Sequence, residues 1–383
     1  MAPIRASNVN RQFSHALITV FMCGDVMTGR GIDQVLPHPG DPALHEPYVR
    51  DARRYVELAE AANGPIPKPA GFAHIWGDAL DILKRMAPDV RIINLETSIT
   101  TSNDYWKGKG INYRMHPGNI PCLTAAGIDV CALANNHVLD WGYGGLDETL
   151  RTLKTHHISG AGAGRNRSEA AAPAVVAITG KGRVLVFSYG AETSGIPGTW
   201  AAGADSAGVN LLPDLSDATV WGVEAGIRAW KRAGDIVVAS IHWGGNWGYA
   251  ISREERAFSH SLIDRCGVDI VHGHSSHHAK GIEVYHGKPV IYGCGDFIND
   301  YEGIGGYEQF RGDLGLMYFV QMDPATGALA GVRMTPTRMK RFAVHRASRA
   351  DAAWLQDMLN WEGKRFGTEV DMEDDNTLVL RWR

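Results

Sequence analysis

Residues 128–142 read IDVCALANNHVLDWG, and this stretch indicates the architecture of the whole chain. Its first half is a short apolar run with β-branched residues, which is typical of a buried strand. Its second half places amide, imidazole and carboxylate side chains directly after that run. Open α/β sheets bind ligands beyond the carboxyl ends of their strands, so this pattern predicts a strand that ends at a functional site.

Four further apolar runs end in the same way. They cover residues 17–23, 90–94, 235–241 and 268–271, and the potential metal ligands that follow them are Asp25, Glu96, His242 and His274. Segments with helical spacing of apolar residues lie between the runs, at 74–86, 146–155, 219–232 and 252–265. The alternation predicts an α/β fold in which side chains far apart in the sequence meet at one edge of a sheet.

Composition excludes several classes of protein. The 383 residues are 44% hydrophobic and 21% charged, with a formal net charge of -4, which is ordinary for a globular chain. The chain lacks the excess of basic residues that would indicate nucleic-acid binding. The five cysteines form no Cys-x-x-Cys pair, which argues against a zinc knuckle and favours a reducing compartment. The apolar run at 16–23 is too short to span a membrane and is interpreted as a strand, so we expect a cytoplasmic protein without a membrane partner.

The chain is expected to form a single domain over residues 1–383. Residues 34–70 contain seven of the 17 prolines and show little periodicity, which predicts an insertion that runs over the surface. Apolar spacing near the end of the chain predicts a last helix around residues 350–361.

Seven short motifs occur in an order that resembles a known family. They are GDVM at 24–27, NLET at 94–97, NNHVLDWG at 135–142, HWG at 242–244, GHSSH at 273–277, IEVY at 282–285 and GCGDF at 293–297. Together they resemble the CapA (poly-γ-glutamate synthesis protein) family of the calcineurin-like metallophosphoesterase superfamily. The resemblance implies a four-layer α/β/β/α sandwich with a metal ion at the strand ends.

The resemblance also implies roles for individual residues. The metal ligands would be Asp25, Glu96, Asn136, His242 and His274, and His137 would be an acid/base group beside the metal. The chain departs from the superfamily pattern at Met27, where a histidine is usual, and at Ser275 or Ser276. Loss of these imidazoles favours one hard divalent cation, Ca²⁺ or Mg²⁺, with Mn²⁺ also compatible.

Two pairs of histidine and aspartate predict acid/base chemistry. His137 has Asp140 three residues later, and Asp296 is expected near the loop that contains His277. A carboxylate behind a histidine fixes its tautomer and tunes its basicity. Two such pairs on either side of a substrate carbon would permit inversion at that carbon, as in the peptide epimerases among CapA-like proteins, which include the one that acts on the C-terminal Trp of lasso-peptide precursors.

The leading hypothesis is therefore a metal-dependent peptide epimerase. Four residues are expected to contact its peptide substrate: Arg30, Trp141, Trp243 and Trp247. A metal-dependent phosphoesterase, a CapA-type protein of poly-γ-glutamate or capsule synthesis, and a non-catalytic binding module are the alternatives. Each site residue also has a structural interpretation: Glu96 could pair with Arg91 or Lys107, for example, and His242 could be a core histidine.

Overall fold

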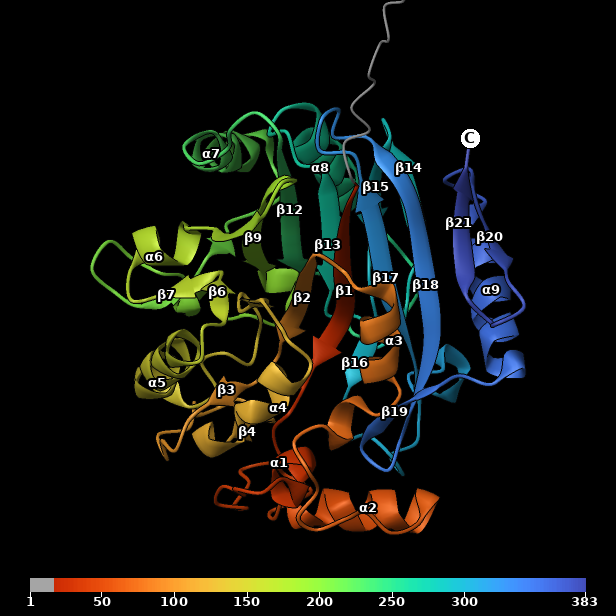
Figure 1. Cartoon of the computed structure of the whole chain (residues 1–383). Helices are drawn as coiled ribbons and strands as arrows, with labels where there is room; N and C mark the ends of the chain where they lie inside the picture. Colours follow the sequence, from red (N-terminus) through yellow and green to blue (C-terminus); the bar gives the residue numbers. More distant parts are fainter. Residues whose placement is uncertain (1–16) are drawn as a thin grey trace, which may run out of the picture.

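Two β-sheets packed face to face form the centre of the structure, a computed structural model that describes residues 17–383 (Figure 1). The ten-stranded sheet has the order β20-β21-β18-β17-β1-β2-β5-β6, with β16 beside β1 and β19 beside β18. The seven-stranded sheet has the order β11-β9-β12-β13-β15-β14, with β8 beside β9. The strands that position the site are β1 (Ile18–Val26), β2 (Val90–Leu95), β5 (Val130–Ala132), β12 (Asp235–His242), β13 (Ile270–His274) and β16 (Asp296–Ile298).

The other strands complete the two sheets. In the larger sheet they are β6 (Ser159–Ala161), β17 (Leu314–Met322), β18 (Leu329–Lys340), β19 (Ala343–Arg346), β20 (Thr368–Met372) and β21 (Leu378–Trp382). In the smaller sheet they are β8 (Ala174–Ile178), β9 (Gly182–Ala191), β11 (Leu211–Leu212), β14 (Ile282–Tyr285) and β15 (Lys288–Ile291). The hairpin of β14 and β15 closes over His286-Gly287, where the sequence predicts a turn.

Alternation along the strands separates the layers. On β1, Val20 and Met22 face the second sheet, whereas Phe21 and Cys23 pack against the outer helices. The same alternation on β12 turns Val238 toward the first sheet. Because successive side chains of a strand point to opposite faces, both sheets are covered on both sides. The predicted four-layer α/β/β/α order is confirmed.

Helices cover the two outer faces. The ten-stranded sheet is covered by α3 (Ala79–Met86), α4 (Pro121–Ala125) and α5 (Gly142–Thr155), and the seven-stranded sheet by α7 (Asp217–Arg228) and α8 (Arg253–Asp264). The first turn of α8 is fixed by a capping box, in which Ser252 and Glu255 each accept a hydrogen bond from the other's backbone N–H. Among residues 17–383, no helix combines the length and the hydropathy that a membrane span requires.

The proline-rich segment 34–70 contains a helix that the sequence analysis does not predict. After the short α1 (Gly31–Val35), the chain makes a loop and then forms α2 (Arg53–Asn63), at the lower edge of Figure 1. Tyr55, Val56 and Ala59 are the buried residues of α2. The helical spacing of these three residues could have predicted α2, but the prolines on either side of it indicated a loop instead.

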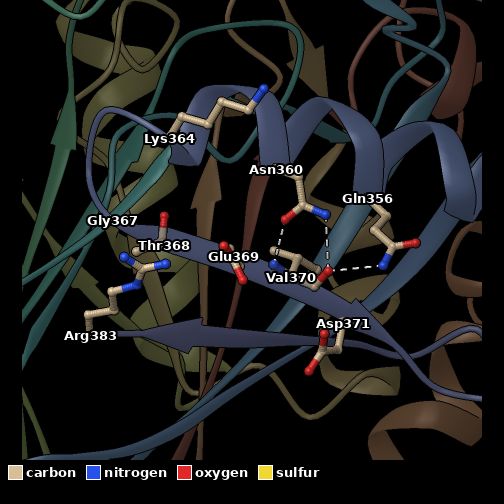
Figure 2. Close-up of a pocket in the computed structure, with 9 residues that line it drawn as sticks. All are labelled: Gln356, Asn360, Lys364, Gly367, Thr368, Glu369, Val370, Asp371 and Arg383. Atoms are coloured by element: carbon tan, nitrogen blue, oxygen red, sulfur yellow. Dashed lines mark hydrogen bonds between the residues drawn. The ribbon is translucent and has the colours of Figure 1, made fainter.

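The C-terminal segment closes one edge of the larger sheet. Helix α9 (Arg349–Gly363) covers the predicted helical residues and packs beside the edge strand β20. The side chains of Gln356 and Asn360 bond the backbone of Val370, which satisfies groups that an open strand edge would expose. A polar groove lies there (Figure 2), lined by Gln356, Asn360, Lys364, Gly367, Thr368, Glu369, Val370, Asp371 and Arg383.

A close crossing of two glycines joins β1 to the segment that leads into β16. A Cβ atom on Gly24 would lie 1.5 Å from the carbonyl oxygen of Gly295, a contact no side chain can make. The backbone N–H of Asp25 donates to that same carbonyl at 3.0 Å. Parallel pairing then places Asp25 opposite Asp296. Glycine at position 24 is therefore needed to bring these two carboxylates together.

Replacement of this glycine tests the crossing. We expect Gly24→Ala to lower the free energy of unfolding by about 3 kcal/mol or more, because the new methyl group meets rigid backbone. Gly144→Ala is the matched control, since its Cβ meets nothing within 4 Å and it lies in α5; we expect no loss there, because alanine favours the helix. Urea unfolding followed by circular dichroism measures both. Equal stability of the two variants would contradict this account.

Candidate metal and acid/base site

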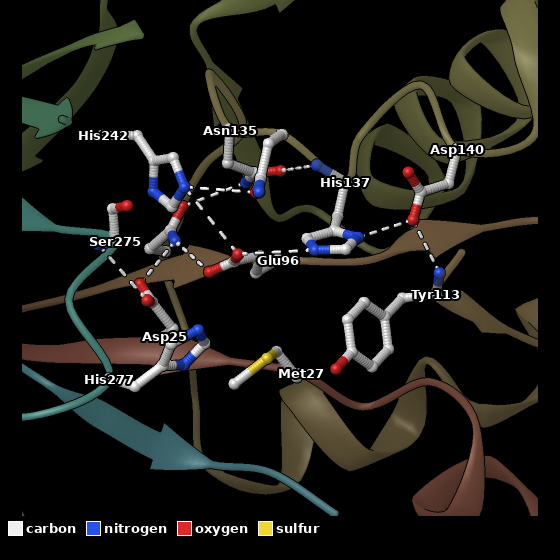
Figure 3. Close-up of polar contacts among 12 residues, drawn as sticks. Asp25, Met27, Glu96, Tyr113, Asn135, His137, Asp140, His242, Ser275 and His277 are labelled. Carbon is white, nitrogen blue, oxygen red and sulfur yellow. Dashed lines mark hydrogen bonds and ion pairs between the residues drawn. The ribbon is translucent and has the colours of Figure 1, made fainter. Parts of the chain in front are cut away.

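Five polar side chains converge at the carboxyl ends of strands from both sheets, as the sequence predicts. Figure 3 shows three of them, Asp25, Glu96 and His242. Asp25, His242 and His274 offer ligand atoms that all lie within 4.8 Å of one another. The Nδ1 atoms of the two histidines are 2.8 Å apart. The Nε2 atom of His242 lies 3.2 Å from Oδ1 of Asn136 and 3.7 Å from Oε1 of Glu96.

Buried carboxylates crowd this point. Burial, together with the neighbouring Asp296, raises the pKa of Asp25 to about 7. Burial and the nearby Asp25 also raise the pKa of Glu96 well above its usual range. Asn94 donates from Nδ2 to Asp25 at 2.7 Å and to Glu96 at 3.2 Å, which holds the two carboxylates side by side. The cluster therefore disfavours several negative charges at once, so these carboxyl groups tend to hold protons unless a cation is bound.

The donor set fits a divalent cation. Burial lowers the pKa of both His242 and His274 well below the ordinary value, so both imidazoles are neutral and their ring nitrogens can ligate. The Oγ of Ser240 lies 2.9 Å from Nε2 of His274 and fixes the orientation of that ring. Two imidazoles together with Asp25 and Glu96 suit an ion that accepts both nitrogen and oxygen ligands.

The first histidine–aspartate pair lies beside Glu96. Nδ1 of His137 is 2.6 Å from Oδ2 of Asp140, and its Nε2 is 3.8 Å from Oε1 of Glu96. The ammonium of Lys109 lies 2.5 Å from Oδ1 of Asp140 and 3.0 Å from Nδ1 of His137. Burial lowers the pKa of His137, Asp140 opposes this effect and Lys109 adds to it, and the resulting pKa is about 4. The Nε2 face of His137 is therefore directed at the cluster.

The second pair, His277 with Asp296, lies next to Asp25. Nδ1 of His277 is 2.9 Å and 3.1 Å from the two carboxylate oxygens of Asp296, and Asn299 donates to Asp296 at 2.9 Å. Burial alone would lower the pKa of His277, but Asp296 more than offsets it, so the pKa lies above the ordinary value. In Figure 3, His277 lies beside Asp25, whereas His137 lies next to Glu96.

The structure contradicts the predicted substrate contact of Arg30. Its guanidinium is buried and bonded to Glu46 at 2.9 Å and to Asp300 at 2.5 Å. The same group lies 3.8 Å from the ring centroid of Tyr55. Both carboxylates and the aromatic ring occupy it, so Arg30 is a buried structural cation.

Two of the three predicted tryptophan contacts are also wrong. Trp141 and Trp243 are each only 2% exposed, and their indole N–H groups donate to the backbone carbonyls of Tyr113 and Tyr292. Both are core residues, although their glycine-rich neighbours indicated loops. Trp247 does lie beside the site: its ring centroid is 5.3 Å from that of His277.

Lys109 and a pair of tyrosines were missed by the sequence analysis. Lys109 belongs to the polar loop 100–113, and only the folded path of that loop brings it to Asp140. Tyr113 packs edge-on against His137 with ring centroids 4.4 Å apart, and Tyr301 packs edge-on against His277 at 5.5 Å. The aromatic content of the loop was the one signal that could have pointed to Tyr113.

Comparison with known proteins gives the family. Residues 19–301 match the family model described as bacterial capsule synthesis protein PGA_cap. The chain belongs to this family. The predicted assignment to the CapA-like proteins is thereby confirmed.

Several known proteins are similar to this chain over most of its length. A probable polyglutamine synthesis accessory protein of Mycobacterium tuberculosis is 49% identical over 365 residues, which is 95% of this chain and 96% of the relative. The PGA biosynthesis protein CapA of Bacillus subtilis is 25% identical over 298 residues, 76% of this chain and 65% of the relative. A solved phosphatase structure from Mycoplasma pneumoniae aligns with a TM-score of 0.45 at 13% identity, covering 84% of this chain and 94% of that one.

Metal removal tests the cation site of this PGA_cap protein. At a free Mn²⁺ concentration 100 times the Kd, we expect binding to stabilise the metal-stripped protein by about 2.7 kcal/mol, seen as a higher melting temperature. Asp25→Asn and His242→Ala should each abolish this shift in melting temperature. Elemental analysis should then find no bound metal in either variant. Without metal, Asp25→Asn should melt no lower than the wild type, because it removes a buried charge.

Exposed residues of the same types provide the controls. Asp205→Asn and His286→Ala should retain metal and the shift, since Asp205 lies on the surface and His286 is 67% exposed. A full complement of metal in both Asp25→Asn and His242→Ala would show that the ion binds elsewhere.

Proposed function

We propose that this protein is a metal-dependent accessory enzyme in the synthesis of a glutamine- or glutamate-type polymer, and that it hydrolyses amide linkages of that polymer. The observation that carries the proposal is the placement of two imidazole–carboxylate pairs around one cation site. In each pair, Nδ1 of the histidine faces an aspartate, which leaves Nε2 available to the substrate.

Hydrolysis of an amide needs a base and an acid at opposite ends of the reaction. One histidine takes a proton from water as its oxygen attacks the carbonyl carbon. The other gives a proton to the nitrogen as the carbon–nitrogen bond breaks. Asp140 and Asp296 hold the two rings in the required tautomers. When bound, a divalent ion supplies Lewis-acid polarisation of the carbonyl oxygen.

Charge at the site favours a neutral substrate. Asp25, Glu96 and Asp296 crowd the site with carboxylate oxygens, and Lys109 is already paired with Asp140. Arg30 is neutralised by its own partners. A phosphate ester needs positively charged partners for its oxygens, so phosphoester hydrolysis is less well supported. The name of the relative from M. tuberculosis includes polyglutamine, whose side chains are neutral amides.

Inversion at a Cα atom is the second candidate function, and the symmetry of the two pairs favours it. One histidine would remove the Cα proton, and the other would deliver a proton to the opposite face of the same carbon. The Cα–H bond that breaks is thus replaced by one that forms, with no net loss of atoms. This is the peptide epimerisation expected from the sequence.

Isotopic labelling distinguishes these reactions. The Mn²⁺-loaded protein is incubated with an N-acetylated, C-amidated oligoglutamine in H₂¹⁸O and, separately, in D₂O. We expect ¹⁸O in new carboxyl groups, detected by mass spectrometry. Deuterium at Cα without ¹⁸O would favour inversion, and cleavage of an aryl phosphate alone would contradict both. His137→Asn and His277→Asn should each lower kcat about 10²–10⁴-fold, whereas the exposed His286→Asn should not.

A further inference from the structure

The two tyrosines that pack against the histidines of the two pairs contact each other through their hydroxyl groups. The hydroxyl oxygens of Tyr113 and Tyr301 are 2.8 Å apart. The rings of these residues pack edge-on against His137 and His277, one against each. In Figure 3, the thioether of Met27 lies between His277 and Tyr113, and the Tyr113 ring lies next to His137.

One hydroxyl donor of the Tyr113–Tyr301 pair has only a weak hydrogen-bond acceptor. Two hydroxyl protons are present, and one of them is shared between the two oxygens. The other is directed from Tyr301 to the sulfur of Met27 at 3.4 Å. A thioether is a weak acceptor, so this O–H gains little from the contact. Burial raises the pKa of both phenols well above their usual range, and both remain protonated donors at neutral pH.

Backbone contacts tie each tyrosine to one of the pairs. The N–H of Tyr113 donates to Asp140 at 2.6 Å. The N–H of Tyr301 donates to Asn299 at 3.1 Å, and Asn299 in turn donates to Asp296. The guanidinium of Arg30 lies 4.6 Å from the Tyr113 ring centroid and 5.7 Å from that of Tyr301. The hydroxyls are thus held at a fixed place relative to both histidines.

We propose that Tyr113 and Tyr301 form an oxygen-binding subsite, in which a hydroxyl of the pair exchanges its contact with Met27 for a carbonyl or carboxylate oxygen of the bound substrate. The subsite deepens the proposed function and rests on it for the identity of the substrate. Its stronger hydrogen bond would form as negative charge develops on that oxygen, which is how fixed donors accelerate reactions at carbonyl groups.

A binding experiment tests the subsite without any need for turnover. The protein is loaded with diamagnetic Mg²⁺ and carries tyrosine labelled with ¹³C at Cζ, and acetate is the probe. Signals are assigned by their loss in Tyr113→Phe and Tyr301→Phe. We expect both signals to shift saturably with acetate, while that of Tyr48, which is 95% exposed, stays in place. Unmoved Tyr113 and Tyr301 signals would overturn the subsite.

Kinetics on the oligoglutamine provide the second readout. We expect Tyr301→Phe to lower kcat roughly 100-fold with little change in KM and with full metal content, because it removes one oxygen-binding donor. Tyr48→Phe should retain wild-type kcat. Equal kcat in Tyr301→Phe and wild type would overturn the subsite. If the wild type cleaves no amide while acetate shifts the Tyr301 signal, the proposed function fails and the subsite stands.

Discussion

The burial of several carboxylates at one point is the constraint on which the rest of this structure depends. Asp25, Glu96 and Asp296 come from three segments of the chain, yet the glycine crossing and parallel strand pairing bring them together. Charges of one sign buried together disfavour the folded state unless a cation or protons offset them. The neutral imidazoles of His242 and His274, contributed by the second sheet, make a metal ion the natural partner of this cluster.

A second cluster of buried charges holds the loop next to the site in place. Arg30 joins Glu46 of the proline-rich segment to Asp300, which lies 270 positions away in the sequence. Asp300 also accepts a hydrogen bond from the backbone of Gly31 at 2.9 Å. Since Tyr301 is the next residue, this ion cluster anchors the loop that carries one wall of the site. The proline-rich segment is thereby tied to the site.

The sequence allowed prediction that polar side chains meet at the strand ends, but it did not reveal all of the residues that meet there. Apolar runs ending in Asp25, Glu96 and His242 were visible because strand-end chemistry is local in sequence. The His137–Asp140 pair was visible for the same reason. Arg30 was misassigned because its partners are distant in the chain, and no periodicity reveals a buried ion pair. Trp141 and Trp243 were misassigned because glycine-rich neighbours indicate a loop but do not tell whether the loop is covered.

Lys109 links a peripheral loop of this protein to the candidate site. The loop 100–113 is held by polar contacts, such as the bonds of Thr100 and Thr101 to Glu148. Segments held in this way open locally at a lower free energy than the whole fold. Opening of the part of this loop around Lys109 would withdraw the ammonium group from His137. The electrostatic environment of this histidine thus depends on a peripheral loop as well as on the strands.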